Sequence, residues 1–295
     1  ALRDSVAPAA LVRAGEADVI VVDAAGFVLL DEAGARRTDT PVLRRLRGDE
    51  AARGLEGATA SFIGVAGGRS VVAIETSRDE VRGHWEHLRA VGWCLDGDDA
   101  ALALTALALA GWHANYRYCP RCGAPVHLVS GGWAARCETC DRLEYPRQDP
   151  AIIVLVQDHD GRVLLAHNAL WQPGFVSIIA GYVEAGESPD VTVAREVAEE
   201  VGVDIETPTY VATQPWPFGR SQMMGYRART LEAHPTPQAD GVEIEWARFY
   251  SREELTRALE SGEISAPGRA SIAYALLREW YGADLPSGPE GAGRK

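Results

Sequence analysis

The stretch GYVEAGESPDVTVAREVAEEVGV, residues 181–203, decides the fold of the C-terminal half of this chain. Ser188, Pro189 and Asp190 predict the start of a helix, because they supply a capping hydroxyl, a proline suited to the first turn and an acid at the positive helix end. Gly202 predicts the end of that helix. Apolar residues recur in between at helical spacing, which predicts a buried face. This face comprises Val191, Ala194, Val197, Ala198 and Val201.

The same helix carries a second, acidic face. Glu196, Glu199 and Glu200 are spaced i, i+3 and i+4, so their side chains point the same way. Three like charges on one face repel each other, and a divalent cation would neutralise them. Carboxylate oxygens suit Mg²⁺ or Mn²⁺. The alternative is a solvated acidic face of an amphipathic helix, which is the usual explanation of a short acidic motif.

The whole stretch decides between these interpretations. It fits the pattern G-x5-E-x7-R-E-U-x-E-E-x-G-U, where U is aliphatic, without a mismatch. It thereby resembles the Nudix box, the signature of hydrolases that cut a diphosphate linking a nucleoside to another group. Agreement at so many positions favours metal binding over a solvated face. The fixed positions are Gly181, Glu187, Arg195, Glu196, Glu199, Glu200 and Gly202.

Four cysteines form a second motif in the middle of the chain. They occur as two Cys-x2-Cys pairs with fourteen residues between the pairs. This spacing predicts a structural Zn²⁺ held by four thiolates, with no open coordination position for catalysis. Two disulfides are the alternative, which a chain without a secretory signal disfavours. The predicted ligands are Cys119, Cys122, Cys137 and Cys140.

The composition of the 295 residues sets further limits. The hydrophobic fraction of 46% is ample for buried cores, and the length suggests at least two domains. Neither an apolar run that could span a bilayer nor a signal-peptide pattern is present, so we expect a cytoplasmic protein without a membrane partner. The net charge of −13 argues against a broad nucleic-acid footprint.

The pattern of apolar and turn residues predicts four parts. A smaller N-terminal α+β domain, 1–112, contains strand pairs at 17–30 and 61–75 and a helix at 98–113. The zinc ribbon, 113–148, comes next. An α/β domain with a mixed sheet, 149–285, ends with a helix opened by a capping box at Ser251 and Glu254 and another at 267–282. The tail, 286–295, is predicted to be disordered.

A third motif, Gln214-Pro-Trp-Pro-Phe218, follows the acidic helix. Together with YPRQDPA (145–151) it resembles the NADH pyrophosphatase (NAD⁺ diphosphatase) subfamily of Nudix hydrolases, whose signature is SQPWPFPxS. The order of N-terminal domain, ribbon and Nudix domain is also similar. Thr213 and Gly219 depart from the signature, and Gly219 loosens the loop. The resemblance implies a Nudix-type α/β/α sandwich.

The third motif suits a dinucleotide ligand. Two prolines hold Trp216 and Phe218 in a rigid extended segment, and rigid aromatic rings stack on bases at low entropic cost. The alternative, a core strand, is disfavoured because proline removes ladder hydrogen bonds. By resemblance, Tyr182 and Tyr145 sandwich a substrate ring, with Tyr145 supplied by the partner subunit of a homodimer. The resemblance further implies that Gln214, Trp216 and Ser221 line this pocket and that Ala273 offers a backbone contact.

The resemblance also implies a further metal-binding or base glutamate at Glu243. Glu245 competes for this role, because alternation along a strand would put both side chains on one face. Arg195 and Glu187 are expected to pair and to brace the helix. Either Glu199 or Glu243 takes the proton from the attacking water.

We therefore predict hydrolysis of NADH or NAD⁺, or a related dinucleotide, to nicotinamide mononucleotide and AMP, with Mg²⁺ or Mn²⁺ at the acidic face. Removal of NAD caps from RNA 5′ ends would use the same cut. From another class, a non-catalytic nucleotide-binding or RNA-binding module with a Nudix fold is the alternative, although such modules typically lose glutamates of the box.

Overall fold

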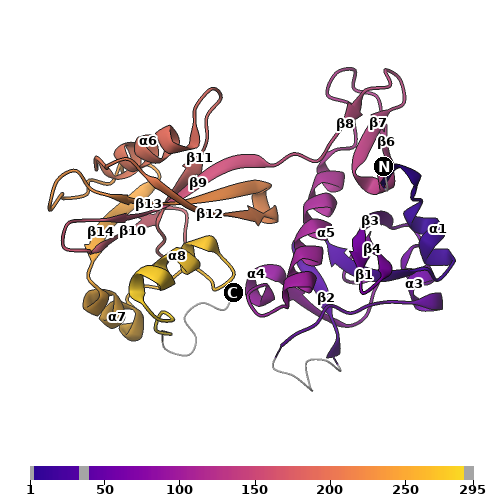
Figure 1. Cartoon of the computed structure of the whole chain (residues 1–295), viewed down its shortest axis with the longest axis horizontal. Helices are drawn as coiled ribbons and strands as arrows, with labels where there is room; N and C mark the ends of the chain where they lie inside the picture. The colour runs from indigo at the N-terminus through magenta and orange to yellow at the C-terminus, as the bar shows by residue number, and fades with distance from the viewer. Residues whose placement is uncertain (1–2, 33–39, 289–295) are drawn as a thin grey trace. The chain divides into compact units, whose positions relative to one another are not determined.

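The computed structural model describes residues 3–32 and 40–288, which form two compact units. The N-terminal unit comprises the chain up to Gln148 together with Trp216–Arg220, and the C-terminal unit comprises Asp149–Pro215 and the chain from Ser221 onward (Figure 1). The sequence analysis separated the ribbon from the N-terminal domain, whereas the structure groups both in one unit. Of the tail predicted at 286–295, residues 289–295 lie outside the described residues.

The N-terminal unit is built on a five-stranded mixed sheet of order β3-β4-β1-β2-β5. Strands β1 (Ala17–Asp23) and β2 (Phe27–Leu30) are antiparallel, as are β3 (Thr59–Ala66) and β4 (Arg69–Glu75), which confirms both predicted strand pairs. Strand β1 runs parallel to β4, and β5 (His84–His87) is antiparallel to β2.

Alternation along β1 explains why helices cover both faces of this sheet. Ile20 and Val22 pack with α5 (Gly97–Asn115), whereas Val19 and Val21 pack with α1 (Pro8–Arg13). Because both sets are buried, β1 is a continuous apolar run. The helix predicted at 98–113 is confirmed. Other helical segments among the described residues before the ribbon include η1 (Arg3–Ser5), α3 (Gly48–Gly54), whose Ala51 joins the α1 side, and α4 (Leu88–Val91).

The ribbon is a small antiparallel sheet of order β6-β7-β8. Its strands are β6 (Val126–Val129), β7 (Ala134–Cys137) and β8 (Leu143–Glu144), with η2 (Ser130–Gly132) between the first two. Trp133 explains its attachment to the N-terminal region: its indole N–H donates to the Phe62 carbonyl at 2.6 Å, and the Arg3 guanidinium lies 3.4 Å above its ring.

The C-terminal unit is built on a mixed sheet of order β12-β13-β9-β10-β14, with β11 paired to β9. Strand β13 runs parallel to β9, while β10 and β11 are antiparallel to β9, and β14 is antiparallel to β10. The strands are β9 (Asp149–Gln157), β10 (Val163–Asn168), β11 (Ile179–Tyr182), β12 (Thr209–Trp216), β13 (Ser221–Arg229) and β14 (Ile244–Tyr250).

Helices cover both faces of this sheet, which confirms the predicted sandwich. Ile152 and Val154 of β9 pack with α6 (Pro189–Val201). Ile153 and Leu155 point the other way and pack with α7 (Arg252–Ser261) and α8 (Ile272–Tyr281). Central β9 is therefore apolar and buried on both faces from Ala151 to Val156. Among the described helices, α6 covers the face of the sheet that carries Ile152 and Val154.

The predicted buried face of α6 was wrong in three positions. Val191, Ala194 and Ala198 are exposed. Val193, with Val197 and Val201, forms the buried i, i+4, i+8 stripe. Thr192 and Glu200 are buried beside this stripe.

The predicted helix ends are partly confirmed. Gly202 ends α6 in the left-handed conformation, at φ 64°. Ser188 occupies the N-cap position, but its hydroxyl makes no capping hydrogen bond, and only its carbonyl oxygen accepts from Thr192. The capping box of Ser251 and Glu254 is present.

Helix α8 begins at Ile272, five residues later than predicted, because Ser271 is its N-cap and accepts from the Tyr274 N–H. Leu276, Leu277 and Tyr274 point inward, as predicted. Within 3–32 and 40–288, none of the helices combines the length and the apolar character that crossing a bilayer requires.

Candidate functional site

The first glycine of the box lies on β11, directly against the acidic helix. A Cβ at Gly181 would lie 2.0 Å from Oε1 and 2.7 Å from Cγ of Glu196. The side chain of Glu196 therefore lies over the strand in a space that only glycine leaves open. This contact explains why the box requires a glycine fifteen residues before a glutamate.

Arg195 connects the helix to the loop that precedes it. Its guanidinium donates to both carboxylate oxygens of Glu187 at 2.8 and 3.0 Å and to the Tyr182 carbonyl at 3.1 Å. These bonds, with one from the Thr192 hydroxyl, lower the pKa of Glu187 to about 2. The expected pairing of Arg195 and Glu187 is thus present, and it fixes the loop against α6.

Arg195 also holds two glutamates of the acidic face. Its Nη1 lies 3.0 Å from an oxygen of Glu196 and 3.0 Å from an oxygen of Glu199. Burial raises the pKa of Glu196, the Arg195 charge opposes this shift, and the charges of Glu199 and Glu243 add to it. Glu199 is the exposed member of the group, at 63% for its side chain. It therefore has the freest access to a ligand from solvent.

Glu200 is the buried member of the acidic face. Only 6% of the residue is exposed. Burial raises the pKa of Glu200 to about 8, and the charges of Glu243, Glu196 and Asp240 contribute to the shift in the same direction. Several carboxylates thus share a poorly solvated region with too little positive charge to balance them.

Glu243 and Glu245 have different surroundings. Strand β14 begins at Ile244, so Glu243 lies outside the strand, and the alternation that was expected to put both on one face does not apply. The Glu243 charge acts on both Glu196 and Glu200. The carboxylate of Glu245 lies 3.6 Å from Nε2 of His167 instead.

The acidic group fits a divalent cation by its chemistry. It offers only carboxylate oxygens, and a cation would offset the repulsion that raises the pKa of Glu200. In the part of the chain that the structure describes, no three of these carboxylates bring oxygens within 4.8 Å of one another. These carboxylates do not surround a common point, since Arg195 forms ion pairs with Glu196 and Glu199.

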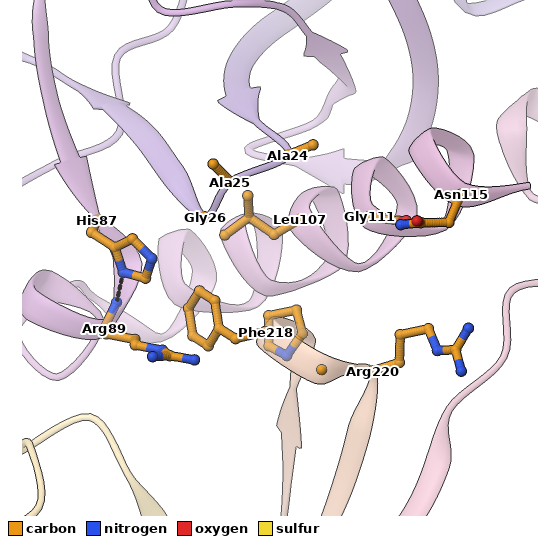
Figure 2. A pocket seen from close by; sticks show the side chains of 12 residues that line it. Ala24, Ala25, Gly26, His87, Arg89, Leu107, Gly111, Asn115, Phe218 and Arg220 are labelled. Carbon is orange, nitrogen blue, oxygen red and sulfur yellow. Dashed lines mark hydrogen bonds between the residues drawn. The ribbon is translucent and has the colours of Figure 1, made fainter. Parts of the chain in front are cut away.

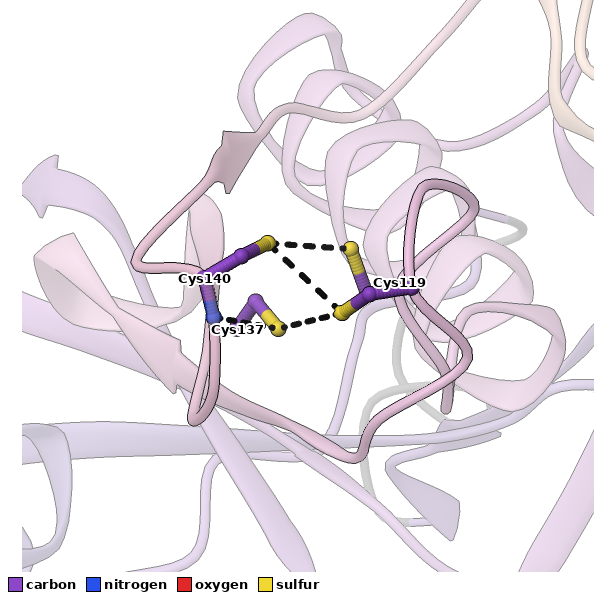
Figure 3. A group of neighbouring side chains, drawn as sticks. Cys119, Cys137 and Cys140 are labelled. Carbon is purple, nitrogen blue, oxygen red and sulfur yellow. Dashed lines mark hydrogen bonds between the residues drawn. The ribbon is translucent and has the colours of Figure 1, made fainter.

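The four predicted zinc ligands converge (Figure 3). The Sγ–Sγ distances are 3.7 Å for Cys119–Cys140, 3.5 Å for Cys122–Cys137 and 3.7 Å for Cys122–Cys140. A tetrahedron with Zn–S bonds of about 2.3 Å has edges of about 3.8 Å. All five cysteines of the chain lie within the described residues and are free of disulfides. The alternative of two disulfides is therefore wrong.

One thiol of this cluster is prepared for metal binding by the backbone. The Cys140 N–H donates to Sγ of Cys137 at 3.5 Å and is the main cause that lowers the pKa of Cys137 to about 6. A thiolate is the form that binds zinc. The fifth thiol, Cys94, lies apart and donates to the Val91 carbonyl.

The predicted substrate-binding residues of the C-terminal unit form two groups. The hydroxyl groups of Tyr182 and Ser221 lie 3.1 Å apart, and the Tyr182 ring is half exposed. The Gln214 amide is bonded at both ends: Nε2 donates to the Ala270 carbonyl at 2.8 Å, and Oε1 accepts from the Ile272 N–H at 2.7 Å. It therefore holds the start of α8, which carries the buried Ala273.

The aromatic residues of the third motif belong to the N-terminal unit. Trp216 and Phe218 meet edge to face, with ring centroids 4.9 Å apart. Strand β12 ends at Trp216, so Gln214, Pro215 and Trp216 lie in an edge strand, and Phe218 lies in η3 (Pro217–Gly219). Pro215 is tolerated in β12 because this strand is at the sheet edge.

Phe218 borders a cavity of about 450 Å³ in the N-terminal unit, which the sequence analysis did not find. Figure 2 shows His87 and Arg89 beside the Phe218 ring. His87 stacks on it at 5.0 Å, and the Arg89 guanidinium lies 4.6 Å from its centroid. Arg220 is a second basic lining residue, and among the described lining residues none is acidic. The cavity suits an anionic or aromatic ligand.

One predicted residue, Tyr145, and two missed ones, Asn168 and Asp240, complete the description. Tyr145 is 60% exposed in the N-terminal unit. Asn168 and Asp240, which the sequence analysis missed, hydrogen-bond to Glu243. Asp240-Gly241 is a turn signal that could have indicated one of them. No local sequence pattern predicted a role for Asn168 or Arg89, because their contacts depend on strand pairing and on packing.

Comparison with known proteins agrees with this geometry. A profile described as the NUDIX domain matches residues 147–272, and one described as the NADH pyrophosphatase zinc ribbon domain matches residues 114–145. The chain is 37% identical to the NAD-capped RNA hydrolase NudC of Mycobacterium bovis (strain BCG / Pasteur 1173P2) over 235 residues, which cover 75% of each chain.

Two more relatives are similar. The NAD-capped RNA hydrolase NudC of Stutzerimonas stutzeri (strain A1501) is 39% identical over 74% of each chain. The mitochondrial NAD(P)H pyrophosphatase NUDT13 of Mus musculus is 34% identical over 68% of this chain and 60% of its own. With the complete box on α6 and the four-cysteine cluster, these matches show that the chain belongs to the Nudix hydrolases, in the NADH pyrophosphatase subfamily that carries a zinc ribbon.

Proposed function

We propose that this Nudix hydrolase cuts the central diphosphate of NADH or NAD⁺, or of a related dinucleotide, to give nicotinamide mononucleotide and AMP. The acidic group of α6 carries the proposal, because buried Glu200 is surrounded by other carboxylates whose repulsion a divalent cation would offset. The names of the relatives support NAD as the substrate class.

We propose that Glu196, Glu199, Glu200 and Glu243 hold Mg²⁺ or Mn²⁺, as their oxygen-only chemistry favours. When bound, such a cation supplies Lewis-acid chemistry: it balances charge on the diphosphate and lowers the pKa of a nearby water. Arg195 keeps the helix and the Glu187 loop in register and holds Glu196 and Glu199 in place before the cation arrives.

Glu243 is our choice for the group that accepts a proton from the attacking water. The Glu199 carboxylate is occupied by its ion pair with the Arg195 guanidinium, whereas the side-chain partner of Glu243 is the neutral amide of Asn168. A general base requires only that its carboxylate reach the water within hydrogen-bond distance.

We propose that aromatic residues bind the nucleotide rings. Trp216 and Phe218 present rigid rings beside Arg89, and the cavity there has the cationic lining that a phosphate or a base prefers. Tyr182 is half exposed and hydrogen-bonded to Ser221, which suits a stacking surface of fixed orientation. Tyr145 of the partner subunit would complete the stack in a homodimer.

Removal of NAD caps from RNA is the second candidate, because two of the relatives are named for it. The cut is the same, so the acidic group suits both. The net charge of −13 favours the free dinucleotide over a long nucleic acid. Measuring the binding of NAD-capped RNA and of NADH as salt is raised would separate them: a steep salt dependence for the RNA alone indicates backbone contacts.

One assay tests the proposed function. The purified protein is incubated with NADH and Mn²⁺ or Mg²⁺, and the products are separated by chromatography. Release of equal amounts of AMP and nicotinamide mononucleotide is expected. If neither appears with either metal, the non-catalytic binding module becomes the better account.

Three further proposals accompany this one. We propose that the division into 1–112, 113–148, 149–285 and a tail at 286–295 describes evolutionary parts, although the first two pack as one unit. We also propose a homodimer, which light scattering on the purified protein would test. We further propose a cytoplasmic location, which fractionation of the source cells would test.

A further inference from the structure

Glu243 is exposed, but the loop that contains it is held by several backbone hydrogen bonds. Its backbone N–H donates to the Asp240 carboxylate at 3.1 Å. The same carboxylate accepts from the N–H groups of Val242, at 3.1 Å, and Ile244, at 2.8 Å. The carbonyl of Glu243 accepts from the Ala169 N–H at 2.9 Å. The backbone of Glu243 is therefore fixed from two sides.

The Glu243 side chain is held by Asn168, the last residue of β10. Nδ2 of Asn168 donates to Oε1 of Glu243 at 3.2 Å, and Oδ1 accepts from the Leu170 N–H at 2.9 Å. An N–H can only donate, so the Leu170 contact sets which end of the amide faces the carboxylate. The Asn168 amide is thereby oriented to donate a hydrogen bond to the Glu243 carboxylate.

A local irregularity of the sheet makes this contact. The β10–β14 ladder pairs His167 with Trp246 and then Asn168 with Ile244, so the register shifts between these two β10 residues. A bulge of this kind redirects side chains at the end of a ladder. Here it places Asn168 beside the residue that precedes β14.

We propose that Asn168 is a positioning residue for the hydrolysis, which orients the Glu243 carboxylate toward the acidic face of α6; this inference rests on the proposed function and goes beyond it. A neutral donor is what the position requires. An aspartate would have the same shape and could still accept from the Leu170 N–H, but it would repel Glu243 instead of holding it.

The test is a double-mutant cycle. Asn168→Ala, Glu243→Gln and the double variant are assayed with NADH at saturating Mn²⁺. Asn168→Ala is expected to lower kcat roughly tenfold, as for loss of one hydrogen bond to a charged group, with KM for NADH within about twofold. In the Glu243→Gln background the same change should lower kcat less than about twofold, because its target is already altered.

Two more variants make the test specific. Asn168→Asp retains an acceptor for the Leu170 N–H and should lower kcat more than Asn168→Ala does, so it tests the proposal even if the alanine variant folds poorly. Glu245→Gln is the matched control: Glu245 lies on the same segment but faces His167, so its kcat should stay within about twofold of wild type. The pH–rate profile should shift for both Asn168 variants and not for the control.

The outcomes are separable. Independent effects of Asn168→Ala and Glu243→Gln, or an Asn168→Asp variant as active as wild type, would overturn the positioning role while leaving the proposed function intact. A wild-type protein that releases no AMP from NADH would remove the proposed function, and this inference with it.

Discussion

Two groups of candidate metal ligands in the described residues, the four cysteines of the ribbon and the carboxylates on and near α6, are built in opposite ways. In the ribbon, four thiols converge with Sγ–Sγ distances of 3.5 to 3.7 Å, which is already the size of a zinc tetrahedron. On α6 the carboxylates do not converge, and Arg195 holds two of them. The cysteine cluster is closed, because four thiolates fill the coordination positions of a zinc ion. The other is open, and a substrate would have to complete it.

The difference follows from what each metal does. A structural zinc contributes to folding, so its ligands need no free position. A catalytic cation must bind the diphosphate, so its protein ligands must leave room for phosphate oxygens and water. In the open cluster, burial and then the charges of neighbouring acids raise the pKa of Glu200, and a bound cation would offset both.

The largest effect is expected from the closed cluster. Cys137→Ser should abolish zinc binding and destabilise the N-terminal unit by several kcal/mol, which corresponds to roughly 10 °C in Tm. Elemental analysis and calorimetry measure both. Cys94→Ser is the control, since Cys94 lies outside the cluster. Wild-type protein that contains no zinc would refute the closed cluster.

The open cluster should respond in activity instead of stability. Glu199→Gln retains the shape but removes a charge, so kcat should fall at least about a hundredfold while Tm stays within a few degrees of wild type. Glu260→Gln, an exposed change on α7, serves as the control. Near-normal turnover of Glu199→Gln in saturating Mn²⁺ contradicts the metal-binding role.

The aromatic motif tests whether substrate recognition is separate from the open cluster. Trp216→Ala should cost roughly 1–3 kcal/mol in kcat/KM for NADH if a stacked base is lost. A small diphosphate substrate without a second nucleoside should be much less affected. If both substrates lose equally, Trp216 supports the fold or the catalytic centre in general, and recognition is not its role.

The smallest effect is the pH dependence of stability that Glu200 of the open cluster should cause. The pKa of Glu200, about 8, lies above its ordinary value of 4.5, so the folded chain binds an extra proton between these values and stability falls as pH rises through this range. We expect on the order of 1 kcal/mol, since solvent and relaxation reduce the effect. Melting curves in magnesium-free buffer from pH 5 to 9 measure it.

Two comparisons sharpen this last prediction. Glu200→Gln should remove the pH dependence, because it leaves no group to titrate. Mg²⁺ should flatten the slope in wild type by balancing the carboxylates. A slope that is the same in wild type and Glu200→Gln would show that other groups cause it.

Spacing along the chain was enough to predict much of the fold and both clusters. The helix with its glutamates, the cysteine pairs, the capping box and the strand pairs all depend on residues within a few positions of one another. Such local patterns predict which side chains share a face. They do not predict how that face is oriented, and so three residues of the expected buried face of α6 are exposed.

What the tertiary structure decided is which distant groups meet. Glu243 and Glu245 could not be separated by alternation, and the start of β14 with the Asn168 bond distinguishes them. No local sequence pattern predicted the cavity that Phe218 and Arg89 line, because its lining comes from segments far apart in the sequence. Hydrogen bonds and ion pairs between such segments depend on register and packing, whereas metal-ligand spacing and helical periodicity are already present in the sequence.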